Sequence, residues 1–267
     1  MTIPKVIHYC WFGGNPLPEL AQKCIASWQK YMPDYEIKQW NETNFDINKC
    51  NCSYIKEAYV AEKWAFVSDY VRFYLIYNYG GVYFDTDVEL IRPISNILDI
   101  GPYMGMEKIS QSKRILVNPG LGIAAPAGLE IYKKIIEYYN KQHFIDVNGN
   151  IDQTTVVHRV TSLLKEYEWD DVGNNIIKVK DIYVYPSEYF CPMDYFSGQI
   201  NISSKTYSIH HYVASWMSQD DKKNTEIFNH YKNKYGNKIG KMIAYIRTYK
   251  LRKKKYGIIK ALYKKYC

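Results

Sequence analysis

The sequence has no CxxC pair and no cysteine or histidine spacing typical of a zinc site. Its six cysteines stand at positions 10, 24, 50, 52, 191 and 267. Cys50 and Cys52 are too close in the chain for an easy disulfide. The cysteine pattern therefore argues against a zinc domain or a disulfide scaffold, and we expect a reduced, cytoplasmic protein.

Long hydrophobic runs are also missing. No apolar stretch reaches the roughly 20 residues that a membrane-spanning helix needs. No charged-then-apolar leader precedes the strand-like IPKVIHYCWF, so we expect no signal peptide. We find no internal repeat and no low-complexity linker. The 267 residues, 47% of them hydrophobic, are enough for one large domain or two small ones, with a substantial core.

Acidic residues are absent from the end of the chain. From Lys232 onward there are 13 Lys and Arg and no Asp or Glu, so the remaining 22 basic and 27 acidic residues give the body a charge of −5. We expect a main domain over residues 1–235 and a basic, amphipathic helical tail over residues 236–267. Such a helix suits an anionic membrane surface. Docking on the body is the second interpretation, and nucleic acid comes last because no recognised binding motif is found.

The hydrophobic pattern predicts an α/β fold. Strands over Ile3–Tyr9 and Tyr35–Trp40 flank a helix over Pro18–Tyr31, which begins an open sheet with right-handed crossovers. A helical stretch over Tyr54–Tyr79 is expected to break near residues 62–63. Ile115–Ala125 is expected to form a strand, a turn and a strand, with Asn118 at the turn. Further strands are expected over 82–84, 88–91, 103–107, 176–179, 183–185 and 206–210, with helices over 129–142 and 153–167.

The most informative stretch is NYGGVYFDTDVELIR, residues 78–92. Asp85 and Asp87 follow a short buried strand and diverge on a regular strand, so they meet on one ion only if the chain turns there. Two carboxylates with open coordination positions suit Mg²⁺ or Mn²⁺ that also holds a phosphate. The stretch therefore favours a metal-dependent enzyme that uses a nucleotide sugar.

Three upstream residues each have two interpretations. Asp69 and Arg72 are opposite charges three apart on an otherwise apolar helix face, which indicates either a structural ion pair or a site for diphosphate and sugar hydroxyls. Trp11 follows the first strand, where α/β sheets bind ligands, and is either a core residue or a platform for a nucleotide base.

Three segments together resemble glycosyltransferase family 32: IPKVIHYCWFGG, SDYVRFYLIYNYGGVYFDTDVEL and IHHYVASW. The resemblance covers residues 3–220. The middle segment is specific because Ser-Asp-x-x-Arg, Gly-Gly, an aromatic and Asp-x-Asp occur in order. Yeast mannosyltransferases and, more remotely, the catalytic domains of large clostridial toxins are similar. The resemblance implies a GT-A fold, a Rossmann-like mixed open sheet flanked by helices, and retention of the anomeric configuration.

The resemblance also implies roles for residues in the first two segments. Trp11 matches the aromatic that stacks on the donor base, and Asp69 and Arg72 match the pair that holds the donor's ribose and sugar. Asp85 and Asp87 match the metal motif, and Asp87 is the favoured direct ligand of the metal.

The third segment matches a loop that closes over the diphosphate. His210 is the favoured third metal ligand, with His211 second, and Ser215 and Trp216 match contacts to the β-phosphate. Asn118 is carried as a donor-binding candidate, although its residue type alone favours a turn.

These expectations combine into one function. The chain is expected to move a hexose from a nucleoside-diphosphate sugar, UDP favoured, to a hydroxyl of a glycan or lipid-linked acceptor, using Mn²⁺ or Mg²⁺. The setting is capsular polysaccharide or lipopolysaccharide synthesis, in the cytoplasm and peripherally at the inner membrane face. The alternatives are a phosphatase of the haloacid dehalogenase type, with Asp85 as nucleophile, and a non-catalytic protein that binds nucleotide sugars.

Overall fold

The structure is a computed structural model that describes residues 2–109, 114–170, 175–195 and 198–213, with residues 227, 230, 231, 235, 236, 242, 243 and 246. Contacts divide the chain into two units, Met1–Val213 and Ala214–Cys267. The described residues of the second unit are helical, and the expected boundary at residue 235 remains a prediction. None of the helices in the described ranges has both the length and the apolar composition needed to cross a bilayer.

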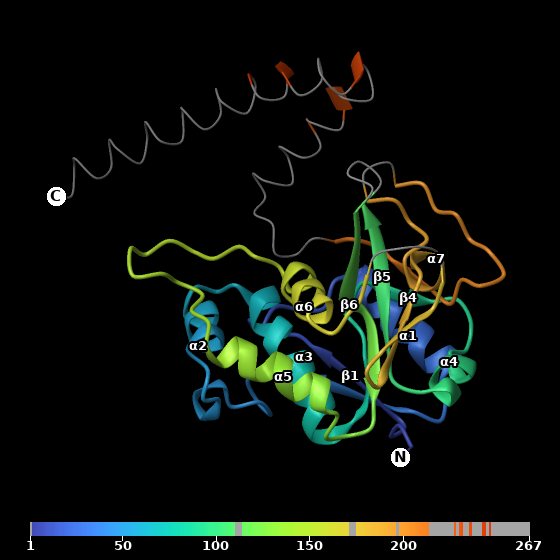
Figure 1. The fold of residues 1–267 in the computed structure, drawn as a ribbon, viewed down its shortest axis with the longest axis horizontal. Helices are drawn as coiled ribbons and strands as arrows, with labels where there is room; N and C mark the ends of the chain where they lie inside the picture. The colour runs from blue at the N-terminus through green and yellow to red at the C-terminus, as the bar shows by residue number, and fades with distance from the viewer. Residues whose placement is uncertain are drawn as a thin grey trace. The chain divides into compact units, whose positions relative to one another are not determined.

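A mixed seven-stranded sheet forms the centre of the first unit (Figure 1). Its order is β2-β1-β3-β6-β5-β8-β7. The pairs β1/β2, β1/β3 and β5/β8 are parallel, and β3/β6, β5/β6 and β7/β8 are antiparallel. The strands span β1 (Val6–Cys10), β2 (Glu36–Trp40), β3 (Gly81–Tyr83), β5 (Tyr103–Ile109), β6 (Arg114–Ala125), β7 (Ile177–Val179) and β8 (Ile182–Tyr185).

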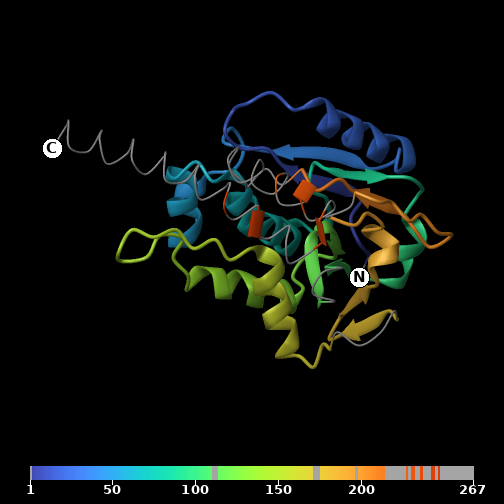
Figure 2. The same cartoon turned by 90° about the horizontal axis from the view of Figure 1, so that it is seen from above.

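Helices cover both faces of this sheet (Figure 2). One face packs against α2 (Ser53–Val60), α3 (Trp64–Tyr79), α5 (Glu130–Asn140) and α6 (Val156–Lys165). The other packs against α1 (Glu19–Tyr31), α4 (Ser95–Ile100), α7 (Ser187–Phe190) and a second, two-stranded sheet of β4 (Val88–Leu90) and β9 (Ser208–His210). A short 3₁₀ helix, η1, spans Ile47–Lys49. The expected mixed open sheet flanked by helices is confirmed.

The two faces follow from the alternation of side chains along the strands. In β1, Ile7 and Tyr9 point to the α1 side while Cys10 belongs to the α3 side. Val82 and Tyr83 in β3 divide in the same way. Because successive strand residues face opposite sides, a strand that is buried on both faces needs apolar residues at every position.

Two glycines carry the chain from α3 into β3. Gly80 and Gly81 have φ values of +66° and +99°, and the Gly80 N–H donates to the Ile76 carbonyl to close the helix. A Cβ atom on Gly81 would lie 2.6 Å from the Val6 carbonyl oxygen. Glycine is therefore required by both conformation and space, and it allows β3 to pair closely with β1.

The expected strand, turn and strand over residues 115–125 is wrong. The structure has one strand, β6, whose pairing with β5 changes register: Met104 faces Ile123, whereas Gly105 faces Asn118. The four residues 119–122 therefore bulge out of the ladder, and Asn118 marks the start of the bulge. Pro119 and the glycines after it resemble a turn in sequence, which explains the error.

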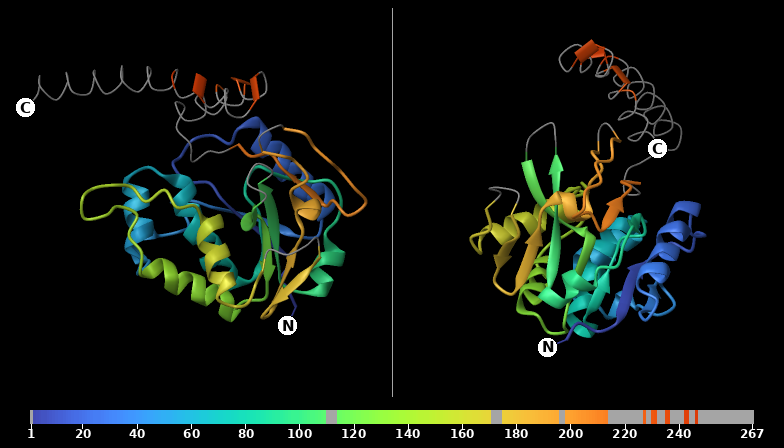
Figure 3. Two further views of the ribbon diagram at one scale, coloured as in Figure 1. Left: turned by 45° about the horizontal axis from the view of Figure 1, so that its top comes forward. Right: turned by 90° about the vertical axis from the view of Figure 1, so that its right-hand side faces the viewer.

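The connection between α5 and α6, residues 141–155, extends away from both helices (Figure 3). Its base is fixed by Glu57 of α2, whose carboxylate accepts hydrogen bonds from the N–H groups of Phe144 and Ile145 at 2.7 and 3.0 Å. At the other end, the Asp152 carboxylate accepts a hydrogen bond from Arg159 of α6. The connection is thus anchored near both ends, while Val147 between them is fully exposed.

Candidate active site

The two aspartates lie where the chain leaves one sheet for the other. β3 ends at Tyr83 in the large sheet, and β4 begins at Val88 in the small one. Between them the Val88 N–H donates to the Asp85 carbonyl at 3.1 Å. The turn on which the metal interpretation of Asp85 and Asp87 depends is therefore present.

Asp85 belongs to a buried charge cluster with α3. The Arg72 Nη2 atom lies 3.1 Å from Asp85 Oδ1 and 2.9 Å from Asp69 Oδ1. The Arg72 side chain is only 4% exposed, and its Nε donates to the Ser68 carbonyl. The Tyr83 hydroxyl donates to Asp85 Oδ1 at 3.1 Å. The predicted pair of Asp69 and Arg72 thus extends to the first aspartate of the motif.

Asp87 is held by the last residue of β9 and the segment that follows it. The His210 Nε2 atom lies 3.3 Å from Asp87 Oδ1, and the Val213 N–H donates to Asp87 Oδ2 at 2.9 Å. The His211 N–H donates to the Asp87 carbonyl. Tyr212, between His211 and Val213, adopts a left-handed φ of +50°. Three contacts in close succession therefore wrap this segment around Asp87.

The two adjacent histidines have different partners. His211 Nε2 lies 2.8 Å from Glu89 Oε2, and Glu89 is also paired with Lys23 of α1. His210 instead contacts Asp87 and packs edge-on against the Tyr212 ring, with centroids 4.3 Å apart. The geometry therefore favours His210 over His211 as the histidine of the site.

Burial and these partners shift the pKa values of the acids. Burial raises the pKa of Asp69 to about 6 and also raises that of Asp85, although Arg72 opposes both shifts. Burial acts in the same direction on Asp87, but His210 and the Val213 N–H lower its pKa to about 2. Burial disfavours the charged form of His210, yet Asp87 keeps its pKa well above the usual value. Asp87 is therefore ionised near neutral pH beside a cationic imidazole.

Asn118 lies beside Asp85 through a glycine. The Asn118 Oδ1 atom accepts a hydrogen bond from the Gly120 N–H at 2.8 Å, and its Nδ2 donates to Glu107 Oε2 at 2.8 Å. The Gly120 carbonyl accepts from the Asp85 N–H at 3.2 Å. A Cβ atom on Gly120 would lie 2.1 Å from Asp85 Oδ2. Neither Glu107 nor Gly120 was predicted from the sequence, because only the β5/β6 register brings them here.

The remaining predicted residues are not joined to this cluster by a described contact. Trp11 is partly buried, and its Nε1 donates to the Asn15 carbonyl within its own loop at 2.6 Å. Burial raises the pKa of its neighbour Cys10 to about 12, and the charges of Arg72 and Asp85 act on the same thiol in opposite directions. Ser215 and Trp216 lie outside the described residues.

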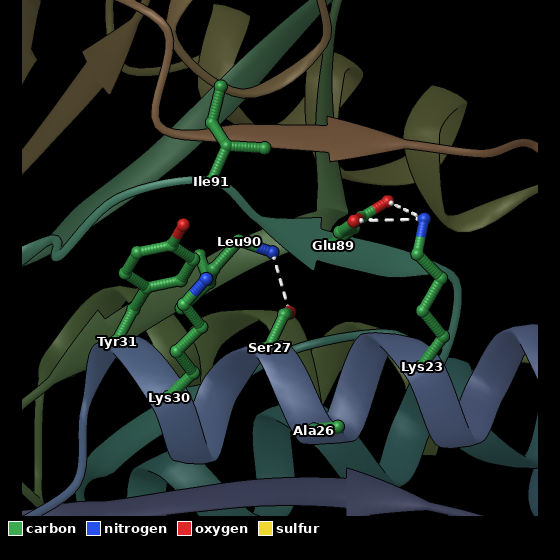
Figure 4. A pocket seen from close by; sticks show the side chains of 8 residues that line it. All are labelled: Lys23, Ala26, Ser27, Lys30, Tyr31, Glu89, Leu90 and Ile91. Carbon is green, nitrogen blue, oxygen red and sulfur yellow. Dashed lines mark hydrogen bonds and ion pairs between the residues drawn. The ribbon is translucent and has the colours of Figure 1, made fainter.

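A pocket of about 250 Å³ lies between α1 and β4 (Figure 4). Figure 4 shows Lys23 reaching the Glu89 carboxylate, with both oxygens 3.0 Å from Nζ, and the Leu90 N–H donating to Ser27 Oγ at 2.9 Å. None of the predicted site residues lines this pocket. It is therefore separate from the acidic motif, although Glu89 connects it to His211.

The donor set suits a hard divalent cation, since Asp85 and Asp87 offer oxygen and His210 offers nitrogen. Within the described part of the chain, no group of three or more His, Cys, Asp or Glu side chains is arranged as metal ligands. Asp85 is paired with Arg72, and Asp87 with His210. An ion bound here would replace at least the contact between Asp87 and His210.

Comparison with known proteins points to one class of enzyme. Residues 18–103 match the family model described as a glycosyltransferase sugar-binding region containing a DXD motif. This range includes Asp69, Arg72, Asp85 and Asp87.

Individual relatives agree with that description. Inositol phosphoceramide mannosyltransferase 3 of Schizosaccharomyces pombe is 31% identical over 103 residues, which cover 36% of this chain and only 28% of the yeast protein. An uncharacterized glycosyltransferase of Acanthamoeba polyphaga mimivirus is 22% identical over 215 residues, which cover 76% of this chain and 83% of the viral protein.

Among solved structures, the PaToxG glycosyltransferase has a TM-score of 0.45 and 17% identity, over 61% of this chain and 69% of that chain. The family model and the sequence relatives favour a transferase over the phosphatase alternative. They support the expected class, a glycosyltransferase with a DXD sugar-binding region.

Proposed function

We propose that the chain is a retaining, divalent-metal-dependent glycosyltransferase of family 32 that moves a hexose from a nucleoside-diphosphate sugar to an acceptor hydroxyl. One observation carries the proposal. The turn between β3 and β4 brings Asp85 against Arg72 and Asp87 against His210, so acidic and basic groups of three separate segments meet beside one motif.

The charges of this cluster match a diphosphate donor. Cleavage of the bond between the sugar and the diphosphate leaves negative charge on the departing phosphate. Preorganised cationic groups stabilise that charge as it develops. Arg72 supplies fixed positive charge in a buried place. Bound at Asp85, Asp87 and the neutral imidazole of His210, Mn²⁺ or Mg²⁺ would add charge stabilisation on the leaving diphosphate.

Two buried nitrogen atoms support the proposal that the site binds an anionic ligand. Within the described residues, Arg72 Nη1 and His210 Nδ1 are buried without a hydrogen-bond partner. A buried polar group without a partner is unfavourable, so a ligand, an ion or water at these atoms would stabilise the site.

The donor hydroxyls have candidate partners as well. Asp69 is proposed to bind ribose or sugar hydroxyls, and Asn118 to bind the sugar. Trp11 is proposed to stack on the base, and Ser215 and Trp216 to contact the β-phosphate. In the transfer proposed here the acceptor hydroxyl gives its proton to the departing phosphate, so no general base is assigned.

The donor is proposed to be a UDP-sugar, and the acceptor a glycan or lipid-linked hydroxyl in surface polysaccharide synthesis. The S. pombe relative is named for mannose transfer to inositol phosphoceramide, so GDP-mannose remains a donor to test. The basic tail is proposed to hold the enzyme peripherally at an anionic membrane on the cytoplasmic side.

The test is a thermal-shift screen of UDP-glucose, UDP-galactose, their N-acetyl amines and GDP-mannose, with and without Mn²⁺. A ligand that binds only the folded state raises the melting temperature, by about 2.7 kcal/mol of apparent stability at 100 times its Kd. Each ligand that shifts melting is then assayed for release of its nucleoside diphosphate. Binding without release would indicate the non-catalytic alternative, and phosphatase activity without nucleotide-sugar dependence would contradict the transferase.

A further inference from the structure

Glu107 is an acidic residue of β5 that none of the roles above uses. Its side chain points toward β6, where Oε2 accepts a hydrogen bond from Asn118 Nδ2 at 2.8 Å. The register explains the contact. Gly105 faces Asn118 and Glu107 faces Leu116, so Glu107 and Asn118 are diagonal neighbours on one face of an antiparallel pair.

The Asn118 amide in turn fixes the bulge in β6. Residues 119–122 have no partner in β5, so the sheet ladder does not hold them on that side. The Asn118 Oδ1 atom accepts from the Gly120 N–H at 2.8 Å and supplies a hydrogen bond that the ladder lacks. The Gly120 N–H is therefore held by a side chain rather than by β5.

Gly120 contacts both the backbone and the carboxylate of Asp85. Its carbonyl accepts from the Asp85 N–H at 3.2 Å, and a Cβ atom at this position would lie 2.1 Å from Asp85 Oδ2. A displacement of Gly120 would therefore move the Asp85 backbone, its carboxylate, or both.

The orientation of the Asn118 amide depends on Glu107. An amide has a donor end and an acceptor end that differ little in shape, so its surroundings select which end points where. An ionised carboxylate only accepts hydrogen bonds. Glu107 therefore selects the Nδ2 end of Asn118, which leaves Oδ1 facing the Gly120 N–H.

We propose that Glu107 is a positioning residue for Asp85, acting through the Asn118 amide and the Gly120 backbone. Glu107 needs no contact with the substrate in this role. The inference rests on the proposed function only for the activity that Asp85 supports, since the hydrogen-bond chain itself is a property of the fold.

The test exchanges the hydrogen-bonding partners. In Glu107→Gln the amide oxygen still accepts from Asn118, so kcat/KM is expected to stay within about threefold of wild type. Glu107→Leu removes the acceptor, and Asn118→Asp places two carboxylates face to face. Each is expected to lose about 10- to 100-fold, the range for one hydrogen bond to a charged group. The double variant Glu107→Gln, Asn118→Asp restores a donor opposite an acceptor and is expected to recover most of the loss.

A second measurement reports on the chain of hydrogen bonds without any substrate. Exchange of the Gly120 amide proton is expected to be slow in wild type, Glu107→Gln and the double variant, and faster in Glu107→Leu and Asn118→Asp. Glu130→Gln, the same change at an exposed position on α5, serves as the matched control and is expected to alter neither measurement.

Two results would overturn the proposal. If the double variant recovers neither Gly120 protection nor turnover relative to Asn118→Asp, the two side chains do not act as a pair. If Glu107→Gln loses as much turnover as Glu107→Leu while Gly120 stays protected, the Glu107 charge acts directly on the reaction. If the wild type transfers no sugar from any donor, the proposed function fails, and Gly120 exchange alone then decides the positioning role.

Discussion

At the scale of single residues, the candidate site is a set of charges that share partners. One nitrogen of Arg72, Nη2, forms ion pairs with both Asp69 and Asp85. His210 contacts Asp87 and lowers its pKa. The two aspartates of one motif therefore have different counterparts, and their pKa values are shifted in opposite directions. Changes at Asp85 and at Asp87 should accordingly have distinct effects.

The first residue-scale prediction concerns Asp87. Asp87→Asn keeps the shape but removes the charge that faces His210 and, in our proposal, the metal. Transfer is expected to fall by about 100- to 1,000-fold, as when one electrostatic group of an active site is removed. Steady-state assays with Mn²⁺ and circular dichroism melting would measure activity and folding. Asp99→Asn, an exposed change on α4, is the control. An active Asp87→Asn enzyme would refute the metal assignment.

The second prediction concerns Gly120. Gly120→Ala places a methyl group where Asp85 Oδ2 now lies, so the carboxylate must move. A displacement of about 1 Å at a catalytic group costs about 100-fold in rate, and we expect a loss of that size in kcat.

Gly128→Ala is the matched control for Gly120→Ala. Gly128 has a φ of +80°, and no atom lies within 4 Å of the position that a Cβ would occupy, so alanine there is strained but touches nothing. It is expected to reduce stability by about 1 kcal/mol and leave kcat unchanged. Equal kcat values for the two alanine variants would show that Gly120 does not constrain Asp85.

Residue types in one continuous segment were predictable, and contacts across the sheet were not. Asp69, Arg72, Asp85 and Asp87 fall within one stretch of 19 residues, so their spacing is visible in the sequence. Glu107 meets Asn118 because β5 and β6 pair with Gly105 opposite Asn118, and Asn118 reaches Gly120 because that register changes after Gly105. No periodicity in the sequence encodes that change.

At the scale of elements, α1 supports the strand that follows the aspartates. The Trp28 Nε1 atom donates to the Val88 carbonyl at 2.7 Å, and the Leu90 N–H donates to Ser27 Oγ at 2.9 Å. β4 is therefore fixed on one side by a helix and on the other by β9, with Val88 opposite His210. This pairing places Asp87 beside His210, although Val88 and His210 are 122 positions apart in the chain.

The sequence predicted local elements better than their pairing. The break between α2 and α3 was expected near residues 62–63 and is confirmed, with Glu62 at a left-handed φ of +55°. The strands that became β4 and β9 were also expected, but not their separate sheet. Helix breaks depend on neighbouring residues, whereas strand pairing over long separations depends on packing that the pattern does not specify.

His8 gives a prediction about how elements are joined. It links β1 to β2 and to the end of α3: Nδ1 accepts from Trp40 Nε1 at 3.0 Å, and Nε2 lies 2.9 Å from the Gly80 carbonyl. Burial lowers the pKa of His8 from 6.5 to about 4, so the folded protein keeps it neutral. The unfolded chain binds a proton below pH 6.5. Stability from neutral His8 is therefore complete above that pH and lost as the pH falls toward 4.

Urea unfolding of wild type and His8→Gln at pH 7 and pH 5 measures this effect. Between those values the proton uptake of the unfolded chain should reduce the wild-type advantage by about 2 kcal/mol, at 1.36 kcal/mol per pKa unit. Because His8→Gln keeps every other titrating group, the contributions of those groups cancel in the difference between the two proteins. A difference in unfolding free energy that does not change with pH would show that His8 titrates normally in the folded state.

At the scale of the whole molecule, charge is divided between the body and the tail. The residues before Lys232 carry a net charge of −5, whereas the rest carry 13 basic and no acidic residues. A negative body is repelled by an anionic surface, so attraction to such a surface would depend on the tail alone. The division therefore predicts that membrane association and catalysis can be separated by truncation.

Removal of residues 236–267 tests that separation. As few as three basic residues near an anionic bilayer contribute about 3 kcal/mol, so truncation is expected to weaken binding to phosphatidylserine vesicles by about 100-fold or more at low salt. Turnover on a soluble acceptor is expected to change less than threefold, because Arg72, Asp85, Asp87 and His210 all precede the deletion.

Vesicle sedimentation of the full-length and truncated proteins, with neutral phosphatidylcholine vesicles as the control, measures the effect on membrane binding. Because the interaction is electrostatic, full-length binding should also fall as salt rises. Equal binding by the truncated protein would remove the membrane role of the tail.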